Sequence, residues 1–224
     1  MKPKVMLLAA GRGERMRPLT DRIPKPLIEI TANTTLIELH INRLKSIGFT
    51  DIVINLAWLG EKIVQLLGDG SRFGVTIEYS DEGDNALETA GGIINALDLL
   101  GAEPFIVINS DIYTDYDFKH LYLQQDKLAQ LVLVPNPEFH REGDFFMKDN
   151  TINNSEGEKF TFSGIAMYHP DFFKGLAAGP LALGPLLRHA IADATINAEI
   201  YNGAWFDIGT PDRLSTIQNY LLNH

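Results

Sequence analysis

Apolar strands alternate with amphipathic helices along the first half of the chain, and this alternation limits the possible folds most strongly. Continuous apolar runs predict buried strands, and apolar residues recurring every three or four positions predict helices. Thr35 and Glu38 form a capping box for the first such helix, and Gly48 ends it. The predicted strands are 5–10, 51–56, 75–79 and 104–109, and the predicted helices are 35–47, 59–67 and 89–100. This βαβ order predicts an α/β fold with a mixed, mostly parallel sheet flanked by helices.

The second half departs from this order. Residues 131–134 and 160–168 are apolar and predict two strands, and the polar residues 141–158 between them predict a hairpin or lid beside the sheet. Residues 204–206 predict a short strand, and Thr210 followed by Pro211 is typical of a helix start. The sequence shows no repeat, low-complexity tract or linker. We therefore expect one domain over residues 1–224.

Composition excludes several kinds of chemistry. The 224 residues include no cysteine, which rules out disulfides, thiolate catalysis and cysteine-ligated metal sites. No two of the six histidines stand three or four positions apart, so a helix-borne histidine pair for zinc is excluded. The apolar runs are shorter than the ~18 residues that a membrane span needs. We expect a cytoplasmic protein with no membrane partner, monomeric or a small homo-oligomer.

Charge is unevenly distributed along the chain. The net charge is −10, yet residues 1–27 hold seven basic and two acidic side chains, so this segment carries +5 and the rest carries −15. An acidic body argues against a nucleic-acid partner. A local basic segment on such a body favours one small, strongly anionic ligand, with an exposed, solvated basic face as the alternative.

A glycine-rich loop follows the first predicted strand. Gly11 and Gly13 flank Arg12, Arg15 follows, and Lys25 stands between two prolines. Glycines let backbone N–H groups approach phosphate oxygens, and arginines add charge-assisted hydrogen bonds. The third glycine of the dinucleotide fingerprint and the Walker lysine motif are both absent. The pattern therefore predicts a phosphate-binding loop, and a plain strand–loop connection remains the alternative.

Two aspartates follow apolar strands directly. Asp111 comes after the strand 104–109, and Asp207 comes after the strand 204–206. Ligands of open α/β sheets bind beyond the carboxyl ends of strands, and carboxylates together with substrate phosphates are the ligand set that Mg²⁺ prefers. An aspartate after a strand also commonly starts a turn. The segment 87–92 lies at a predicted helix start, and its small residues permit either close approach of a base or sugar, or tight helix–sheet packing.

The quoted segments carry a resemblance to a known family. Residues 7–20 (LLAAGRGERMRPLT) and 24–30 (PKPLIEI) resemble the signature of the sugar-phosphate nucleotidyltransferases. The similarity covers the whole chain and is greatest to the short N-acetylmuramate α-1-phosphate uridylyltransferases of peptidoglycan (cell-wall) recycling. The further segments that carry it are NLAWLGEKI, LGDGSRFG, LETAGGI, TDYDF, GDF, FSGI and WFDIGTPDRL.

The resemblance implies a Rossmann-like nucleotidyltransferase fold similar to the GT-A architecture, and it implies roles for individual residues. Mg²⁺ would be held by Asp111 and Asp207, and catalysis would rest on these two residues with Arg15 and Lys25, which contacts the α-phosphate. The other implied contacts are Gly11, Arg12, Gly13 and Arg15 to the triphosphate, Ala9, Ala10 and Glu82 to ribose and base, and Asn109 and Asp144 to the sugar phosphate.

The chain also departs from the family pattern. Ser110 replaces the usual glycine before the metal-binding aspartate, and residues 141–145 stand in place of the Glu-Lys-Pro motif of longer relatives. The C-terminal β-helix of the bifunctional members is absent. A muramate substrate carries a lactyl carboxylate, and Arg141 is the sequence candidate for binding it.

The implied reaction joins an NTP and a sugar 1-phosphate into an NDP-sugar and pyrophosphate, with UTP and N-acetylmuramic acid 1-phosphate as the expected substrates. Mannose or heptose 1-phosphate with GTP, and phosphocholine with CTP, are alternatives within the class. A GT-A glycosyltransferase and a non-catalytic nucleotide-sugar sensor are alternatives outside it. The first normally requires an Asp-x-Asp metal motif, and the second has no need of both aspartates and Lys25.

Overall fold

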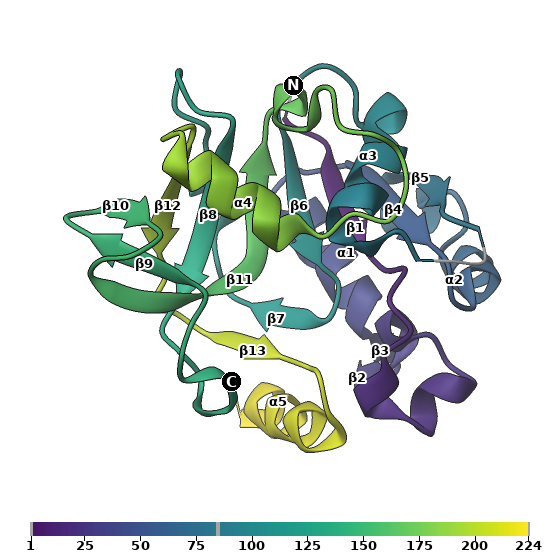
Figure 1. Ribbon diagram of the computed structural model, residues 1–224. Coiled ribbons are helices and arrows are strands. Elements are labelled where there is room, and N and C mark those ends of the chain that lie inside the picture. Colours follow the sequence, from purple (N-terminus) through teal and green to yellow (C-terminus); the bar gives the residue numbers. More distant parts are fainter. Residues whose placement is uncertain (1, 84–85, 224) are drawn as a thin grey trace.

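The computed structural model describes residues 2–83 and 86–223, and it places a mixed sheet between two layers of helices (Figure 1). The strands of the first half run parallel in the order β6, β1, β4, β5. They are β1 (Val5–Leu8), β4 (Asp51–Leu56), β5 (Thr76–Asp81) and β6 (Phe105–Asn109). The connecting helices are α1 (Leu36–Ser46), α2 (Gly60–Leu67) and α3 (Glu88–Leu100). The predicted fold class is confirmed, and the capping box at Thr35 is formed.

Strand β1 lies in the middle of the sheet, with β4 on one side and β6 on the other. Val5 and Leu7 belong to the apolar cluster beneath α1 and α2, whereas Met6 belongs to the cluster beneath α3 and α4 (Leu183–Ala192). All three side chains are completely buried. A strand covered on both faces needs apolar residues at every position, which explains the continuous run in the sequence.

The second half of the chain extends the sheet beyond β6. Strand β11 pairs antiparallel with β6, β8 and β9, and β12 runs parallel to β8. Strands β9 and β10 form a hairpin, which confirms the hairpin predicted within 141–158. The bounds are β8 (Ala129–Val134), β9 (Phe145–Lys148), β10 (Thr151–Asn153), β11 (Glu158–Tyr168) and β12 (Ile196–Ile200). One domain over residues 1–224 stays a prediction.

The sequence pattern does not predict α4 or β12. Helix α4 contains Gly184 and Pro185 in its first turn, and both residues are typical of loops. Proline is tolerated there because the N–H groups of a first turn have no helical partner. Leu183 and Leu187 then bury the helix against the sheet. Among the helices in the described part of the chain, none is long and apolar enough to cross a membrane.

A small two-stranded sheet lies against one end of the main sheet, below it in Figure 1. It pairs β7 (Ile112–Thr114) antiparallel with β13 (Trp205–Asp207). Helix α5 (Pro211–Asn223) packs beside it, near the ladder of β2 (Glu29–Thr31) and β3 (Thr34–Thr35). Strand β7 follows β6 almost directly. Its pairing with β13 therefore brings the end of β6 close to β13, although these two strands are far apart in sequence.

Helix α1 carries a buried histidine beneath β7. His40 is buried, its Nε2 has no hydrogen-bond partner, and the residue hydrogen-bonds to the backbone of Ile112. Burial is the main cause that lowers the pKa of His40 from 6.5 to about 4, and it outweighs the hydrogen bond and the charge of Asp111, which both raise it. The folded protein therefore holds His40 neutral at mildly acidic pH.

We expect the free energy of unfolding to fall as the pH drops from about 6.5 to 4, since unfolded His40 takes up a proton in that window and folded His40 does not. The loss from this one group amounts to about 3 kcal/mol at pH 4. Urea unfolding of the wild type and of His40→Asn between these pH values tests it. The stability advantage of the wild type should shrink as the pH falls, and a constant difference would contradict the assignment.

Candidate active site

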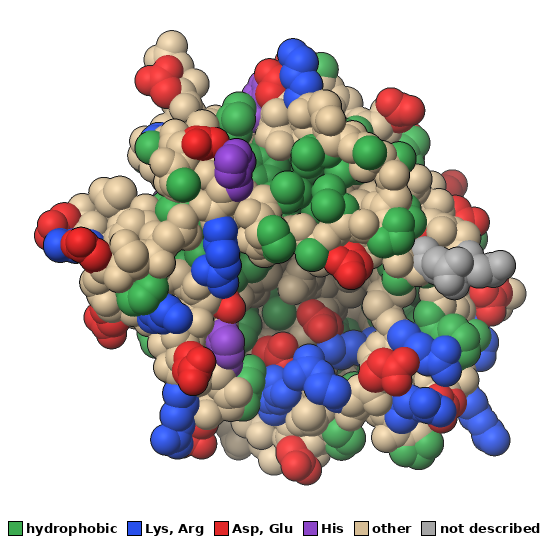
Figure 2. Space-filling model, viewed as in Figure 1, with side chains coloured by type: hydrophobic (Ala, Val, Ile, Leu, Met, Phe, Trp, Pro, Cys, Tyr) green, Lys and Arg blue, Asp and Glu red, His purple; other side chains and the backbone are tan. Residues whose placement is uncertain are grey.

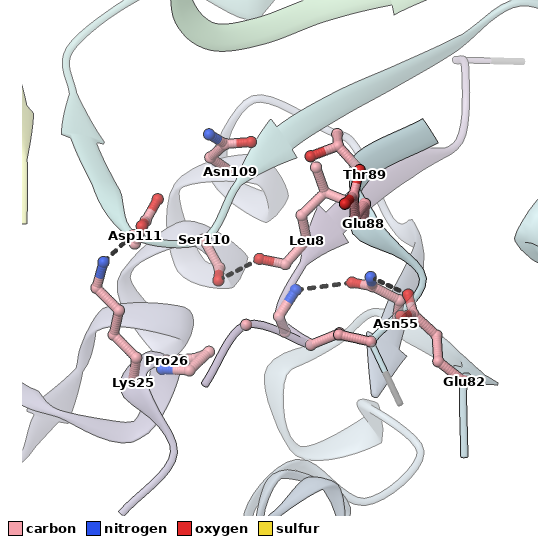
Figure 3. A pocket seen from close by; sticks show the side chains of 14 residues that line it. Leu8, Lys25, Pro26, Asn55, Glu82, Glu88, Thr89, Asn109, Ser110 and Asp111 are labelled. Atoms are coloured by element: carbon pink, nitrogen blue, oxygen red, sulfur yellow. Dashed lines mark hydrogen bonds and ion pairs between the residues drawn. The ribbon is translucent and has the colours of Figure 1, made fainter. Parts of the chain in front are cut away.

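The carboxyl ends of β1, β4 and β6 meet at one edge of the sheet, and the residues that follow them line a cleft (Figure 3). Parallel strands necessarily end at the same edge, which is where ligands of open α/β sheets bind. Figure 2 shows a hollow in the middle of this face, with Lys and Arg side chains gathered along its lower rim.

Three adjoining hollows form the cleft. The central hollow, of about 230 Å³, lies at the ends of β1, β4 and β6. The glycine-loop hollow, also about 230 Å³, shares Lys25 and Asp111 with it. The hairpin hollow, of about 510 Å³, shares Glu88 and Asn109 with it and extends to β9 and α4. Because neighbouring hollows share walls, an extended ligand has room to occupy all three.

A buried asparagine joins three segments under the central hollow. Asn55, at the end of β4, accepts a hydrogen bond from the Ala9 N–H on Oδ1 at 2.7 Å and donates from Nδ2 to Glu82 Oε1 at 2.6 Å. Glu82 Oε2 accepts from the Leu87 N–H at 2.7 Å. Strand β1 therefore ends at Leu8, two residues earlier than predicted, because the Ala9 N–H donates to the Asn55 side chain and not to a neighbouring strand. Glu82 lines the hollow as expected, but protein groups occupy both its oxygens, and its contact with ribose or base stays a prediction.

The two glycines of the basic loop serve different purposes. Gly13 has a left-handed backbone (φ +67°), and a Cβ there would stand 3.0 Å from the Thr20 side chain and 3.3 Å from Lys25 Cβ. Gly11 has no such restraint, because a Cβ there would meet nothing within 4 Å. Gly11 nevertheless lines both the central and the glycine-loop hollows. Its missing side chain leaves open space in the cleft, and this suits close approach of a ligand.

Lys25 is buried at the junction of these two hollows. Only 7% of the residue is exposed, and its Nζ lies 2.5 Å from Asp111 Oδ2 (Figure 3). The neighbouring prolines restrict the backbone, so the ammonium group is held in place. Ser110, beside Asp111, donates from Oγ to the Leu8 carbonyl at 2.5 Å and ties the end of β6 to the end of β1. The serine thus fits where the family pattern has glycine.

Asp207 reaches Asp111 through the β7–β13 ladder. The register places Asp207 opposite Ile112, and the Ile208 N–H donates to the Asp111 carbonyl at 2.9 Å. Asp207 Oδ1 is ion-paired with Arg213 of α5. Each aspartate therefore has a basic partner, Lys25 for one and Arg213 for the other.

Basic side chains converge around Gly209. A Cβ at this position would lie 2.5 Å from Asp207 Oδ1, 3.0 Å from Arg15 Nη2 and 3.1 Å from Arg213 Nη2. Gly209 and Arg15 also line the glycine-loop hollow. The absence of a side chain at 209 therefore allows two arginines and the carboxylate to gather at this hollow.

The two aspartates fit a divalent cation that is shared with a substrate. Among the residues that the structure describes, no three His, Cys, Asp or Glu side chains cluster as a metal cage. Mg²⁺ characteristically binds through one or two carboxylates and completes its ligands with water and substrate phosphates. Asp111 and Asp207, beside the open glycine-loop hollow, provide that donor set.

The hairpin hollow contains a fixed carboxylate. Asp144 Oδ2 accepts from the Phe162 N–H at 2.8 Å, and Oδ1 lies 3.0 Å from His140 Nε2. Its carbonyl accepts from Arg188 Nη1 at 3.2 Å. Asp144, Arg188 and Asn109 line this hollow together, so it offers hydrogen-bond acceptors, an amide and a cation to a polar ligand.

Two predicted contacts lie outside the three hollows. The Arg12 guanidinium stacks 4.0 Å from the centroid of the Trp58 ring and pairs with Glu14 at 3.3 Å. Arg141 is exposed, and its carbonyl accepts from Asn136 Nδ2 at 3.2 Å. The other predicted residues line the hollows, apart from Asp207, which adjoins them: Ala9, Ala10, Gly11, Gly13, Arg15, Lys25, Glu82, Asn109, Asp111 and Asp144.

The sequence analysis missed Asn55, Arg188 and Arg213. Asn55 is a polar residue near the end of an apolar strand, and Arg213 lies within the segment WFDIGTPDRL, so both had a usable signal. Arg188 had none, because its helix was not predicted. Glu88 lies in the candidate segment 87–92 but was given no role of its own. It lines two hollows and begins α3 with a left-handed backbone (φ 58°), a strained conformation of the kind that concentrates at functional sites.

Similarity to known proteins agrees with this geometry. Residues 4–145 match the family model described as nucleotidyl transferase. The chain is 47% identical to an N-acetylmuramate alpha-1-phosphate uridylyltransferase of Neisseria meningitidis, across 96% of each chain. It is 31% identical to a protein of the same name from Caulobacter vibrioides, across 93% of each chain. A probable mannose-1-phosphate guanylyltransferase of rice is 30% identical, over 97% of this chain and 64% of that protein.

Solved structures show the same fold. A Bacillus anthracis protein assigned as a glucose-1-phosphate thymidylyltransferase superposes with a TM-score of 0.84 at 22% identity, over 98% of this chain and 95% of that one. HddC from Yersinia pseudotuberculosis, complexed with GMP-PN, superposes with a TM-score of 0.79 at 21% identity, over 98% and 100%. With the family match and the similarity to the Neisseria protein, this chain belongs to the nucleotidyl transferase family, among its sugar-1-phosphate nucleotidyltransferases.

Proposed function

We propose that this chain is a Mg²⁺-dependent uridylyltransferase that joins UTP and N-acetylmuramic acid 1-phosphate into UDP-N-acetylmuramic acid and pyrophosphate, in cytoplasmic peptidoglycan recycling. The observation that carries the substrate is the 47% identity to the Neisseria uridylyltransferase along 96% of both chains. The similarity to the rice guanylyltransferase supports mannose 1-phosphate as the substrate less strongly, because the identity is 30% and this chain covers 64% of that protein.

The reaction is a substitution at the α-phosphorus of UTP. An oxygen of the sugar phosphate forms the new bond to this phosphorus, and the bond to the oxygen that bridges the α and β phosphates breaks. The electron pair leaves with pyrophosphate. The attacking oxygen is already ionised at neutral pH, so no general base is needed. Catalysis therefore depends on in-line positioning and on neutralising charge.

The order of the hollows suits the order of the substrate groups. Uridine would occupy the central hollow above the Asn55–Glu82 contact, and the phosphates would extend into the glycine-loop hollow toward Gly11 and Arg15. The sugar would occupy the hairpin hollow beside Asn109 and Asp144. The reacting phosphates then meet near Lys25, which borders two of the three hollows.

The two ion pairs of the cleft suggest a role for each charged residue. Without substrate, Lys25 neutralises Asp111 and Arg213 neutralises Asp207. Mg²⁺ bound by the two aspartates would supply the positive charge that offsets repulsion between the sugar phosphate and the nucleotide. Lys25 and Arg213 would then turn from the carboxylates to phosphate oxygens, and Arg15 would stabilise the departing pyrophosphate.

Pyrophosphate release with a panel of substrates tests the proposed reaction. We expect UTP with N-acetylmuramic acid 1-phosphate to give the highest kcat/KM among combinations of UTP, GTP and CTP with muramate, mannose and heptose 1-phosphates and with phosphocholine. GTP is the most informative rival base, because the Yersinia structure contains a guanine nucleotide analogue. A preference for GTP with mannose or heptose 1-phosphate would replace the proposed substrates by the alternative pair.

The aspartates should be required for metal-dependent turnover. Asp111→Asn and Asp207→Asn remove the charge and keep the shape, so we expect each to lower kcat/KM by roughly 100-fold or more without a large loss of stability. Calorimetric titration of Mg²⁺ with UTP should show weakened joint binding. Asp171→Asn, an exposed aspartate on the surface, is the matched control. Full Mg²⁺-dependent activity in either cleft variant would refute the metal assignment.

Lys25 should act on the chemical step. Its contact with the α-phosphoryl group strengthens as charge develops there, so Lys25→Met should lower kcat by about 10²–10³-fold and change the KM for UTP little. Lys174→Met, at an exposed lysine, controls for loss of charge. Single-turnover kinetics separate chemistry from product release. An effect confined to KM would make Lys25 a binding residue only.

A further inference from the structure

Arg188 occupies the hairpin hollow in a defined position. Its Nη1 donates to the Asp144 carbonyl at 3.2 Å, and its Cζ lies 5.2 Å from the centroid of the Phe145 ring. These contacts orient the guanidinium from α4 toward β9, and residues of both elements line a hollow of about 510 Å³. They use one of the five N–H donors that a guanidinium offers.

The guanidinium of Arg188 has no carboxylate partner in the part of the chain that the structure describes. Arg72 is paired with Glu38 at 2.8 Å and Arg17 with Asp21 at 2.7 Å, whereas Arg188, like Arg15 in the glycine-loop hollow, lines the cleft without such a pairing among the described residues. The protein has a net charge of −10, so an arginine that lines a cleft without a carboxylate partner is available to an anionic ligand. A planar guanidinium with free N–H groups matches a carboxylate or a phosphate in bidentate geometry.

The place of Arg188 in the cleft distinguishes these two anions. Lys25 and Asp111 border the central and glycine-loop hollows, and neither lines the hairpin hollow. The reacting phosphate of a sugar 1-phosphate must lie beside Lys25 and the aspartates. The sugar ring then extends past Asn109 toward Arg188. An anion at this far end is a substituent of the sugar rather than its phosphate.

We propose that Arg188 binds a carboxylate carried by the sugar ring, and that it thereby selects carboxylated sugar 1-phosphates over neutral-ring ones. This inference rests on the proposed uridylyltransferase function and assigns its sugar specificity to one residue. Arg141, the candidate from the sequence, is exposed as Arg188 is, but unlike Arg188 it does not line the hollow. The backbone and side chain of Asp144 hold the site together, through Arg188 on one oxygen and the Phe162 N–H on another.

The test compares two sugar phosphates that differ only in the lactyl group. With UTP, Arg188→Gln should lower kcat/KM for N-acetylmuramic acid 1-phosphate by about 10- to 100-fold, mostly through KM, because the contact is the same in ground and transition states. For N-acetylglucosamine 1-phosphate the change should stay within about twofold. Arg188→Lys, which keeps a charge but not the fork, should recover part of the preference.

Controls separate the possible outcomes. Arg72→Gln removes an exposed guanidinium that lines none of the three hollows and should leave the preference intact. Calorimetric binding of UDP-N-acetylmuramic acid, compared with UDP-N-acetylglucosamine, should show the same selective loss in Arg188→Gln without any turnover. Unchanged thermal unfolding of the variant shows that the loss is local.

Four results would overturn the proposal. An equal loss on both sugars would make Arg188 a phosphate-binding or structural residue. A selective loss in Arg141→Gln instead would move the carboxylate site to that arginine. If the wild type prefers muramate and Arg188→Gln leaves that preference unchanged, the role of Arg188 is refuted and the proposed substrate stands. A wild type that uses N-acetylglucosamine 1-phosphate at least as well would instead refute the proposed substrate, and this inference with it.

Discussion

The parallel ladder of β4, β1 and β6 is the constraint on which the rest of the molecule depends. Strand β1 is covered on both faces, so its backbone groups must be hydrogen-bonded to strands on both sides and its side chains must be apolar. Parallel strands end at one edge. This shared edge therefore brings together the glycine loop, Asn55 and the segment 109–111, although they are far apart in the sequence.

Electrostatics within the cleft runs opposite to that of the whole protein. The body is acidic, yet Lys25, Arg15 and Arg213 converge on the two aspartates. A buried ammonium group is costly unless it is paired, and Asp111 provides the pair at 2.5 Å. In the proposed reaction the same two charges would exchange partners when a polyphosphate and a cation bind together. Each aspartate thus has its negative charge balanced by a basic side chain of the cleft.

Several side chains in and around the cleft have a structural task that a motif does not reveal. Glu82 was predicted as a ribose or base contact, and its two oxygens hold Asn55 and the Leu87 backbone. Arg12 was predicted as a phosphate contact, and its guanidinium stacks on Trp58. Both predictions were based on a side chain whose chemistry suits a ligand. In the folded protein, residues of other strands and loops contact that side chain, and a sequence motif does not show which residues these are.

The sequence by itself determined the α/β class, the glycine loop, and Asp111 and Asp207 as candidates, since each depends on local patterns: apolar runs, missing Cβ atoms, and aspartates directly after strands. The hairpin within 141–158 could be predicted from the sequence for the same reason. Tertiary structure alone decided that β13 pairs with β7, which brings two aspartates 96 positions apart to one place. It also decided that α4 forms despite its Gly184 and Pro185, because burial of Leu187 outweighs weak local propensity. Arg188 enters the cleft only through that helix, so long-range packing, which leaves no local pattern, determines that part of the site.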